Sequence, residues 1–171
     1  MLQNLARGLV AAMFAAAACV HAASPAAPLK VGFVYVSPIG DAGWTFQHEQ
    51  GRLDLQKALG AQVQTSVVEG VAEGADSERV LRDLAAQGHQ LIFATSFGYL
   101  EPTLRVAAEY PNVRFEHVGG YKTAPNLNTY NARYYEARYL AGLLAGKTSK
   151  SGIAGYVAGF PVEIQSSDGS T

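Results

Sequence analysis

The sequence predicts an α/β domain in which a parallel sheet is covered by helices on both faces. Three observations lead to this fold class. Short, nearly continuous apolar runs alternate with segments whose apolar residues recur at helical spacing, which is typical of strand–helix–strand crossovers. The 171 residues fit one domain of ordinary size, and no repeat of fixed period is present. With 49% hydrophobic and 16% charged residues, the chain can bury a real core.

The first 23 residues predict an export signal. Arg7 is the only charged residue there, an apolar run spans 9–20, and Val20-His21-Ala22 offers the small residues that a signal peptidase prefers. A short buried helix is the alternative interpretation. Residues 24–29 then form a linker, and we expect the mature chain in the periplasm. Cys19 either carries a lipid that anchors the chain to the plasma membrane or is removed with the signal.

The first elements follow in order after the linker. The apolar run 31–36 suits a strand buried on both faces. Turn-forming residues separate it from a helix predicted over 44–59, which Gly60 can end in a left-handed conformation. β-Branched residues predict a second strand at 63–68.

The second helix has the clearest pattern in the chain. Its N-cap is predicted at Asp76 and its end at Gly88. Charged residues on its outer face can form two ion pairs at i,i+4 spacing, Glu78 with Arg82 and Arg79 with Asp83. The residues predicted to share its inner face are Ser77, Val80, Leu81, Leu84, Ala85 and Gly88.

Further strands are predicted at 91–95, 113–118, 127–130 and 153–157. A third helix carries apolar residues at helical spacing from Leu100 to Ala108, with Pro102 in its first turn. The strand predicted at 153–157 has no helix after it, so we expect the chain to stop within a fold. The inward residues predicted for a fourth helix are Ala137, Leu140, Ala141, Leu143 and Leu144.

Two loops should form the binding edge, because ligands of open parallel sheets bind at the carboxyl ends of the strands. They are 37–44 after the first strand and 95–99 after the third, and each combines glycines, hydroxyl residues and an aromatic ring. Each candidate also has a structural alternative: Trp44 and Phe97 could be core residues, Asp41 could cap the following helix, and Ser96 could be a turn residue or a cap. The candidate ligand-binding residues are Asp41, Trp44, Ser96 and Phe97.

No enzyme chemistry is predicted. The sequence contains no G-x-G-x-x-G after the first strand, no Walker A loop and no G-x-S-x-G elbow, and its histidines follow no zinc spacing. Ser96, His117 and Asp41 can be written as a triad, but nothing in their spacing supports one. We therefore expect no catalytic residue, cofactor or metal. The net charge of −1 gives no basic field for nucleic acid.

Several segments, in the same order, resemble the BMP family (basic membrane protein, PnrA-like) of ABC transporter solute-binding proteins. The likeness runs from about Lys30 to Ile164. Each segment is a weak signal by itself, whereas their order is fairly specific. The segments are 30–36, Gly40-Asp41-Ala42-Gly43-Trp44-Thr45-Phe46 and the residues up to Gly51, 93–98, 110–115, 136–142 and 151–155.

The resemblance implies a type I periplasmic-binding fold, in which two lobes clamp a ligand, often a purine nucleoside between aromatic rings. By motif position Trp44 matches the family's stacking Phe, Asp41 its loop Asp, and Ser96 and Phe97 its second loop. The partners implied are the permease subunits of an ABC importer. The family's Thr-Asp after strand one is replaced by Val36-Ser37-Pro38, which leaves a purine, a nucleobase or another flat polar solute open.

The family's proteins are about twice as long as this chain. We expect residues 30–150 to form the N-terminal lobe, 151–164 to begin the second lobe, and 165–171 to be an unpatterned tail left by truncation. A lone lobe should bind weakly or not at all, because it lacks the closure of a clamp. Three alternatives remain: a sugar-type binding protein, an exported hydrolase on a flavodoxin-like sheet, and a repressor core, for which no helix-turn-helix is present.

Overall fold

The computed structural model describes residues 27–157, so the predicted signal, Cys19 and the tail at 165–171 lie outside the described residues. Two 3₁₀ turns, Gly60–Gln62 and Phe97–Tyr99, accompany the regular elements. In chain order these elements are β1 (Leu29–Val34), α2 (Trp44–Leu59), β2 (Val63–Val68), α3 (Ala75–Ala86), β3 (Leu91–Ala94), α4 (Leu100–Glu109), β4 (Arg114–Val118), β5 (Leu127–Tyr130) and α5 (Tyr134–Thr148).

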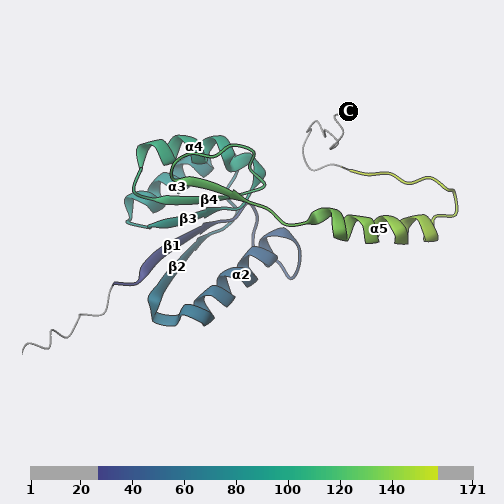
Figure 1. The fold of residues 1–171 in the computed structure, drawn as a ribbon, viewed down its shortest axis with the longest axis horizontal. Coiled ribbons are helices and arrows are strands. Elements are labelled where there is room, and N and C mark those ends of the chain that lie inside the picture. Colours follow the sequence, from purple (N-terminus) through teal and green to yellow (C-terminus); the bar gives the residue numbers. More distant parts are fainter. Residues whose placement is uncertain (1–26, 158–171) are drawn as a thin grey trace, which may run out of the picture. The chain divides into compact units, whose positions relative to one another are not determined.

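The five strands form one parallel sheet in the order β2-β1-β3-β4-β5. Helices α3 and α4 lie on one face of this sheet and α2 lies on the other (Figure 1). The chain first moves outward from β1 to β2 and then crosses back over β1 to β3. The direction of growth therefore reverses at β1, and the carboxyl ends of β1 and β3 form a topological switch point. The predicted α/β architecture is confirmed.

The larger core lies between the sheet and the α3/α4 layer. Leu81, Ile92, Val106, Phe115 and Leu127 are almost completely buried there. The predicted inner face of α3 is confirmed from Ser77 to Ala85, where the residues assigned inward are buried. Gly88, which was assigned to the same face, is exposed and lies beyond the end of the helix.

The outer face of α3 carries both predicted ion pairs, Glu78 with Arg82 at 2.9 Å and Arg79 with Asp83 at 3.4 Å. The N-cap prediction at Asp76 is wrong. The N-cap lies two residues earlier, at Gly74, whose positive φ of 88° turns the chain into the helix without a side-chain cap.

A polar network fixes α2 against the opposite face of the sheet. The Arg52 guanidinium donates two hydrogen bonds to the Glu49 carboxylate, at 2.8 and 2.5 Å, and a third to Thr65 of β2 at 2.7 Å. The buried Tyr35 hydroxyl donates to the same carboxylate at 3.1 Å. The hydrogen bonds from Arg52 hold the pKa of Glu49 below its usual value, and burial raises that of Tyr35. α2 is thus anchored by charge as well as by apolar contact.

The residues from Asn131 onward form a second compact unit that contains α5. Two predictions are wrong here. The residues assigned inward on this helix are exposed, Leu140 and Leu144 each at 65%, and residues 153–157 form no strand. An apolar face needs a layer to cover it and a strand needs a neighbour for its hydrogen bonds. Within this unit the described residues supply neither.

No helix within residues 27–157 has the length and apolar character needed to span a bilayer.

Candidate functional site

The candidate site lies at the switch point, where the ends of β1 and β3 are fastened together. The backbone N–H and the side-chain hydroxyl of Thr95 both donate to the carbonyl of Val34, at 3.3 and 2.7 Å. Beyond this point the two connections diverge, one into α2 and the other through the 3₁₀ turn 97–99 into α4. The divergence opens the edge at which open α/β sheets bind ligands.

Trp44 is attached to the end of β3 by its indole N–H. The nitrogen donates to the carbonyl of Thr95 at 2.5 Å, although the two residues are 51 positions apart. The side chain remains 42% exposed, so the alternative of a core tryptophan is wrong. The ring of His48, one turn further along α2, lies 4.9 Å away between centroids. The indole is therefore held in place while part of its surface faces solvent.

Gly43 allows the chain to enter α2 at this position. It is the N-cap of the helix, with a positive φ of 93°, and no side chain caps the helix. The alternative role of Asp41 as the cap is therefore wrong. Asp41 is exposed, and its carboxylate makes no hydrogen bond or ion pair with other described residues.

Other contacts shape the loop after β1. Ser37 and Thr45 share a hydrogen bond of 2.7 Å, which closes the base of the loop onto the first turn of α2. The backbone N–H of Ile39 donates to the carboxylate of Glu69, which follows β2, at 2.7 Å. Asp41 is thus carried on a loop whose two ends are fixed.

Ser96 and Glu73 meet at the second loop. The Ser96 hydroxyl donates to the Glu73 carboxylate at 2.6 Å, and the backbone N–H of Gly98 donates to the same oxygen at 3.3 Å. Ser96 is buried, whereas Glu73 is exposed. The contact joins the connection after β2 to the end of β3, which are separated by 23 residues in the sequence. Sequence reasoning did not identify Glu73.

Phe97 lies beside the loop that follows β4. Its ring centroid is 6.0 Å from that of Tyr121, and the rings are tilted by 36°. Tyr121 is largely exposed, and the ammonium group of Lys122, which forms an ion pair with Glu101, lies 5.5 Å from its ring centroid. A third loop therefore contributes an aromatic ring to this edge, which sequence reasoning also did not identify.

His117 lies in the core behind the second loop, at the end of β4. It is completely buried, and neither ring nitrogen has a hydrogen-bond partner within the part of the chain that the structure describes. Burial lowers the pKa of His117. Because Ser96 donates to Glu73 and not to His117, the geometry gives no support to a hydrolase triad.

Three of the four predicted residues lie at the switch point, on two different connections. Trp44 reaches the end of β3, and Ser96 and Phe97 follow that strand directly. Asp41 stands on the adjoining loop. The edge thus offers a held aromatic surface and exposed carboxylates, which is suited to a flat solute bearing hydrogen-bond donors. Within residues 27–157, no cluster of His, Cys, Asp and Glu could hold a metal ion.

Comparison with known proteins points to one family. A family model described as ABC transporter substrate-binding protein, PnrA-like, matches residues 29–168. A purine-binding protein of Brucella abortus is 57% identical over 134 residues, which cover 78% of this chain and 38% of the relative. A Haloferax volcanii protein, named for glucose binding in an ABC transporter, is 41% identical over 134 residues and is covered to 34%.

A solved structure supports the same fold. The solute-binding protein of an ABC transporter system from Conexibacter woesei is 27% identical and superposes with a TM-score of 0.60, covering 69% of this chain and 40% of that one. The chain therefore spans about two fifths of this structure and of the Brucella relative.

Proposed function

The chain belongs to the PnrA-like family of ABC transporter substrate-binding proteins, and we propose that it captures a purine base or nucleoside for an ABC importer. The observation that carries the proposal is the hydrogen bond from the Trp44 indole to Thr95 O, which holds a partly exposed ring at the switch point. A purine is a flat bicyclic ring that covers an indole well. Stacking of one base on an aromatic side chain contributes about 1–3 kcal/mol.

The polar groups at the same edge suit a purine. Amino and ring N–H groups of a purine are donors, and the exposed carboxylates of Asp41 and Glu73 are acceptors. The family relative of Brucella is named for purine binding, which supports the same choice of solute. The family resemblance implies a second lobe, which would cover the other side of the base. The part of the protein described by residues 27–157 supplies contacts to one side of the base only, for which we expect a dissociation constant on the order of 1 mM.

The single tryptophan makes the proposal testable in the intact chain. Adenosine should quench the emission of Trp44 and shift its indole N–H resonance during an NMR titration, because the base stacks on the ring. Phe97→Leu should weaken this response several-fold. The matched control Leu59→Ala removes an exposed apolar side chain at the opposite end of α2, within the same compact unit, and should leave the response unchanged. The proposal fails if saturating adenosine, adenine and guanosine all leave the Trp44 resonance unmoved.

A sugar is the second candidate solute, because the Haloferax relative is named for glucose binding. Aromatic rings and carboxylates also bind sugars, through ring C–H groups and hydroxyl donors. Titration with glucose and ribose separates the two proposals. Purine binding predicts small shifts with both sugars, whereas a sugar-binding site would respond to one of them and not to adenosine.

Export and the transporter partners are further proposals. The apolar segment at 9–20 and the small residues before Ala23 support secretion into the periplasm. Fractionation of cells that express the whole chain tests it: the mature protein should begin near residue 23 and appear in the periplasmic fraction. The ABC permease subunits would receive the solute from there.

A further inference from the structure

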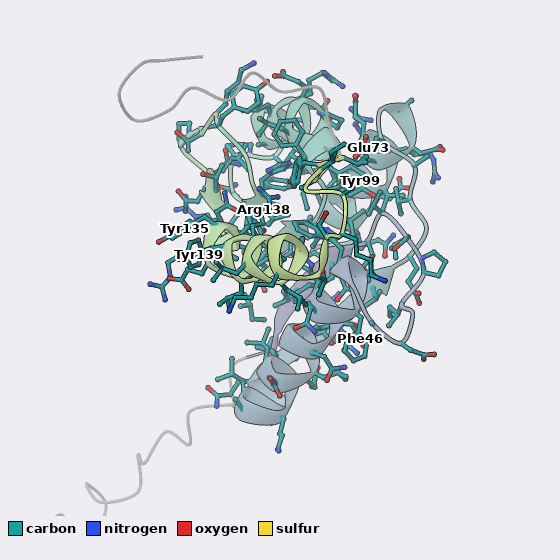
Figure 2. All side chains as sticks on the ribbon, turned by 90° about the vertical axis from the view of Figure 1, so that its right-hand side faces the viewer. Phe46, Glu73, Tyr99, Tyr135, Arg138 and Tyr139 are labelled. Atoms are coloured by element: carbon teal, nitrogen blue, oxygen red, sulfur yellow. The ribbon has the colours of Figure 1, made fainter. Side chains whose placement is uncertain are left out.

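Glu73 occupies an unusual position at the binding edge. One carboxylate oxygen accepts hydrogen bonds from the Ser96 hydroxyl and the Gly98 N–H, at 2.6 and 3.3 Å. The carboxylate packs so closely on Gly98 that a Cβ there would lie 2.2 Å from the Glu73 Cδ. Glu73 also lies beside Tyr99 (Figure 2), and its charge adds to burial in raising the pKa of Tyr99. Two donors of the second loop thus fix the Glu73 carboxylate, which belongs to the connection after β2.

Glu73 retains acceptor capacity. Among the described residues no Lys or Arg forms an ion pair with it, so its charge is balanced only by dipoles and solvent. Its second oxygen accepts no hydrogen bond from the described residues. The Ser96 hydroxyl hydrogen is already used, which leaves Ser96 only an acceptor for any solute. The pair as a whole therefore presents acceptors and no donor.

Further carboxylates stand on the connections that meet at this edge. Asp41 and Glu69 belong to the adjoining connections, and Lys122, from the third loop, is already paired with Glu101. A phosphate brought to this edge would face these carboxylates, and Lys122, the cation beside the Phe97–Tyr121 rings, is already paired with Glu101. Like charges at short range disfavour binding, and a desolvated anion without a partner is costly.

We propose that Glu73 is the specificity-determining residue of the site, which selects uncharged or cationic solutes bearing hydrogen-bond donors and rejects phosphorylated ones. This inference rests on the proposed capture of a purine at the same edge. The donors can come from the amino group and ring N–H of the base or from the hydroxyls of a ribose. Their common chemistry is a neutral N–H or O–H group that a carboxylate accepts.

Two substitutions separate the role of Glu73 from a structural one. Glu73→Gln keeps the side-chain size and the acceptor for Ser96, but it removes the charge and replaces one acceptor by an amino donor. Gly98→Ala keeps the carboxylate and displaces it, since the added methyl group overlaps Glu73 and the backbone at Gly98 does not have a positive φ. Glu109→Gln, on the exposed surface of α4, is the matched control.

The experiment compares adenine, adenosine and AMP by the initial slope of the Trp44 indole shift in the whole chain. The expected result is that Glu73→Gln and Gly98→Ala each lower the adenosine slope about tenfold, while Glu73→Gln leaves or raises the AMP slope. Glu109→Gln should match the parent protein. Loss of the adenine response as well assigns the contact to the base, whereas loss with adenosine alone assigns it to the ribose.

Two results would overturn the inference, and they differ in what else they reject. If the parent protein binds adenosine and Glu73→Gln keeps the same ratio of adenosine to AMP, Glu73 is not the selective group and the proposed function stands. If no purine moves the Trp44 resonance of the parent protein, the proposed function fails and the assignment of Glu73 fails with it. Circular dichroism spectra of both variants show whether the fold is intact.

Discussion

Removing the guanidinium of Arg52 should strongly destabilise the unit that carries the site. Arg52 and Glu49 form a bidentate ion pair whose side chains are only 17% and 10% exposed. Arg52→Met fills much of the same volume but leaves the Glu49 charge with one donor, the Tyr35 hydroxyl. Breaking a fully buried pair in this way costs about 3–5 kcal/mol. Because some water reaches this pair, we expect about 3 kcal/mol.

The assay is urea denaturation of the whole chain, followed by the fluorescence of its single tryptophan. Trp44 is the first residue of α2, so its emission reports on the helix that Arg52 anchors. At pH 7 the midpoint should fall, and the melting temperature should drop by roughly 12–24 °C for a unit of about 100 residues. Adding Glu49→Gln to Arg52→Met removes the second charge, which should restore at least half of the loss.

The pH dependence provides an independent check. In the parent protein the hydrogen bonds from Arg52 lower the pKa of Glu49, so this group adds stability above pH 4.5 that is lost as pH falls through its folded value. Without Arg52, burial should raise the pKa of Glu49 above its unfolded value. Protonation then relieves the buried charge, so the deficit should be smaller at pH 5 than at pH 7. A deficit below 1 kcal/mol at pH 7, or one that does not change with pH, would refute the reasoning.

Two further predictions concern buried polar groups. The Asn126 amide donates to three backbone carbonyls, those of Ala107, Tyr110 and Val113. In urea denaturation Asn126→Ala should therefore lower the free energy of unfolding by about 2–3 kcal/mol, and Asn126→Asp should lower it further. Equal stability of Asn126→Asp and the parent would contradict this. Burial lowers the pKa of His117. Below about pH 6.5 the unfolded chain therefore binds a proton at this residue that the folded chain does not bind, and the free energy of unfolding falls. His117→Leu should flatten that loss between pH 7 and pH 5, and parallel profiles would show that another group causes it.

The sequence predicted best those elements in which the spacing of apolar and charged residues directly determines which side chains are buried. In α3 the apolar residues must share a face to be buried, and the charged residues are left at i,i+4 spacing on the other face. The cap was misplaced because an Asp near a helix start suggests a side-chain acceptor. At Gly74 the backbone makes the turn without one.

The same reasoning failed after Tyr130. The pattern of α5 identifies an apolar side, but it cannot say what covers that side, and the leucines expected inward are exposed. A strand at 153–157 needs a partner that β-branched and aromatic residues do not supply by themselves. Both errors come from elements whose structure depends on other segments rather than on their own sequence.

The candidate site lies between these two cases. Trp44, Ser96 and Phe97 were predicted because a loop after a parallel strand must reach the carboxyl edge, and this holds for any order of the strands. Glu73 could not be predicted in this way. Its contact with Ser96 requires the connection after β2 to lie near the end of β3. The strand order β2-β1-β3 brings these segments together, and no local sequence pattern predicts that order.

On the proposed assignment of Trp44 to the stacking position, the tryptophan adds a donor that the phenylalanine of the family pattern would lack. A phenyl ring packs but has no donor, whereas the indole N–H binds the carbonyl of Thr95 and fixes the ring before a solute arrives. A ring that is already ordered loses less conformational freedom on binding, so more of its stacking energy remains as affinity. In the same way Ser96 gives its donor to Glu73 and holds that carboxylate in place. The edge therefore combines a fixed flat surface with fixed acceptors, and its best complement is a flat ring whose rim carries N–H groups.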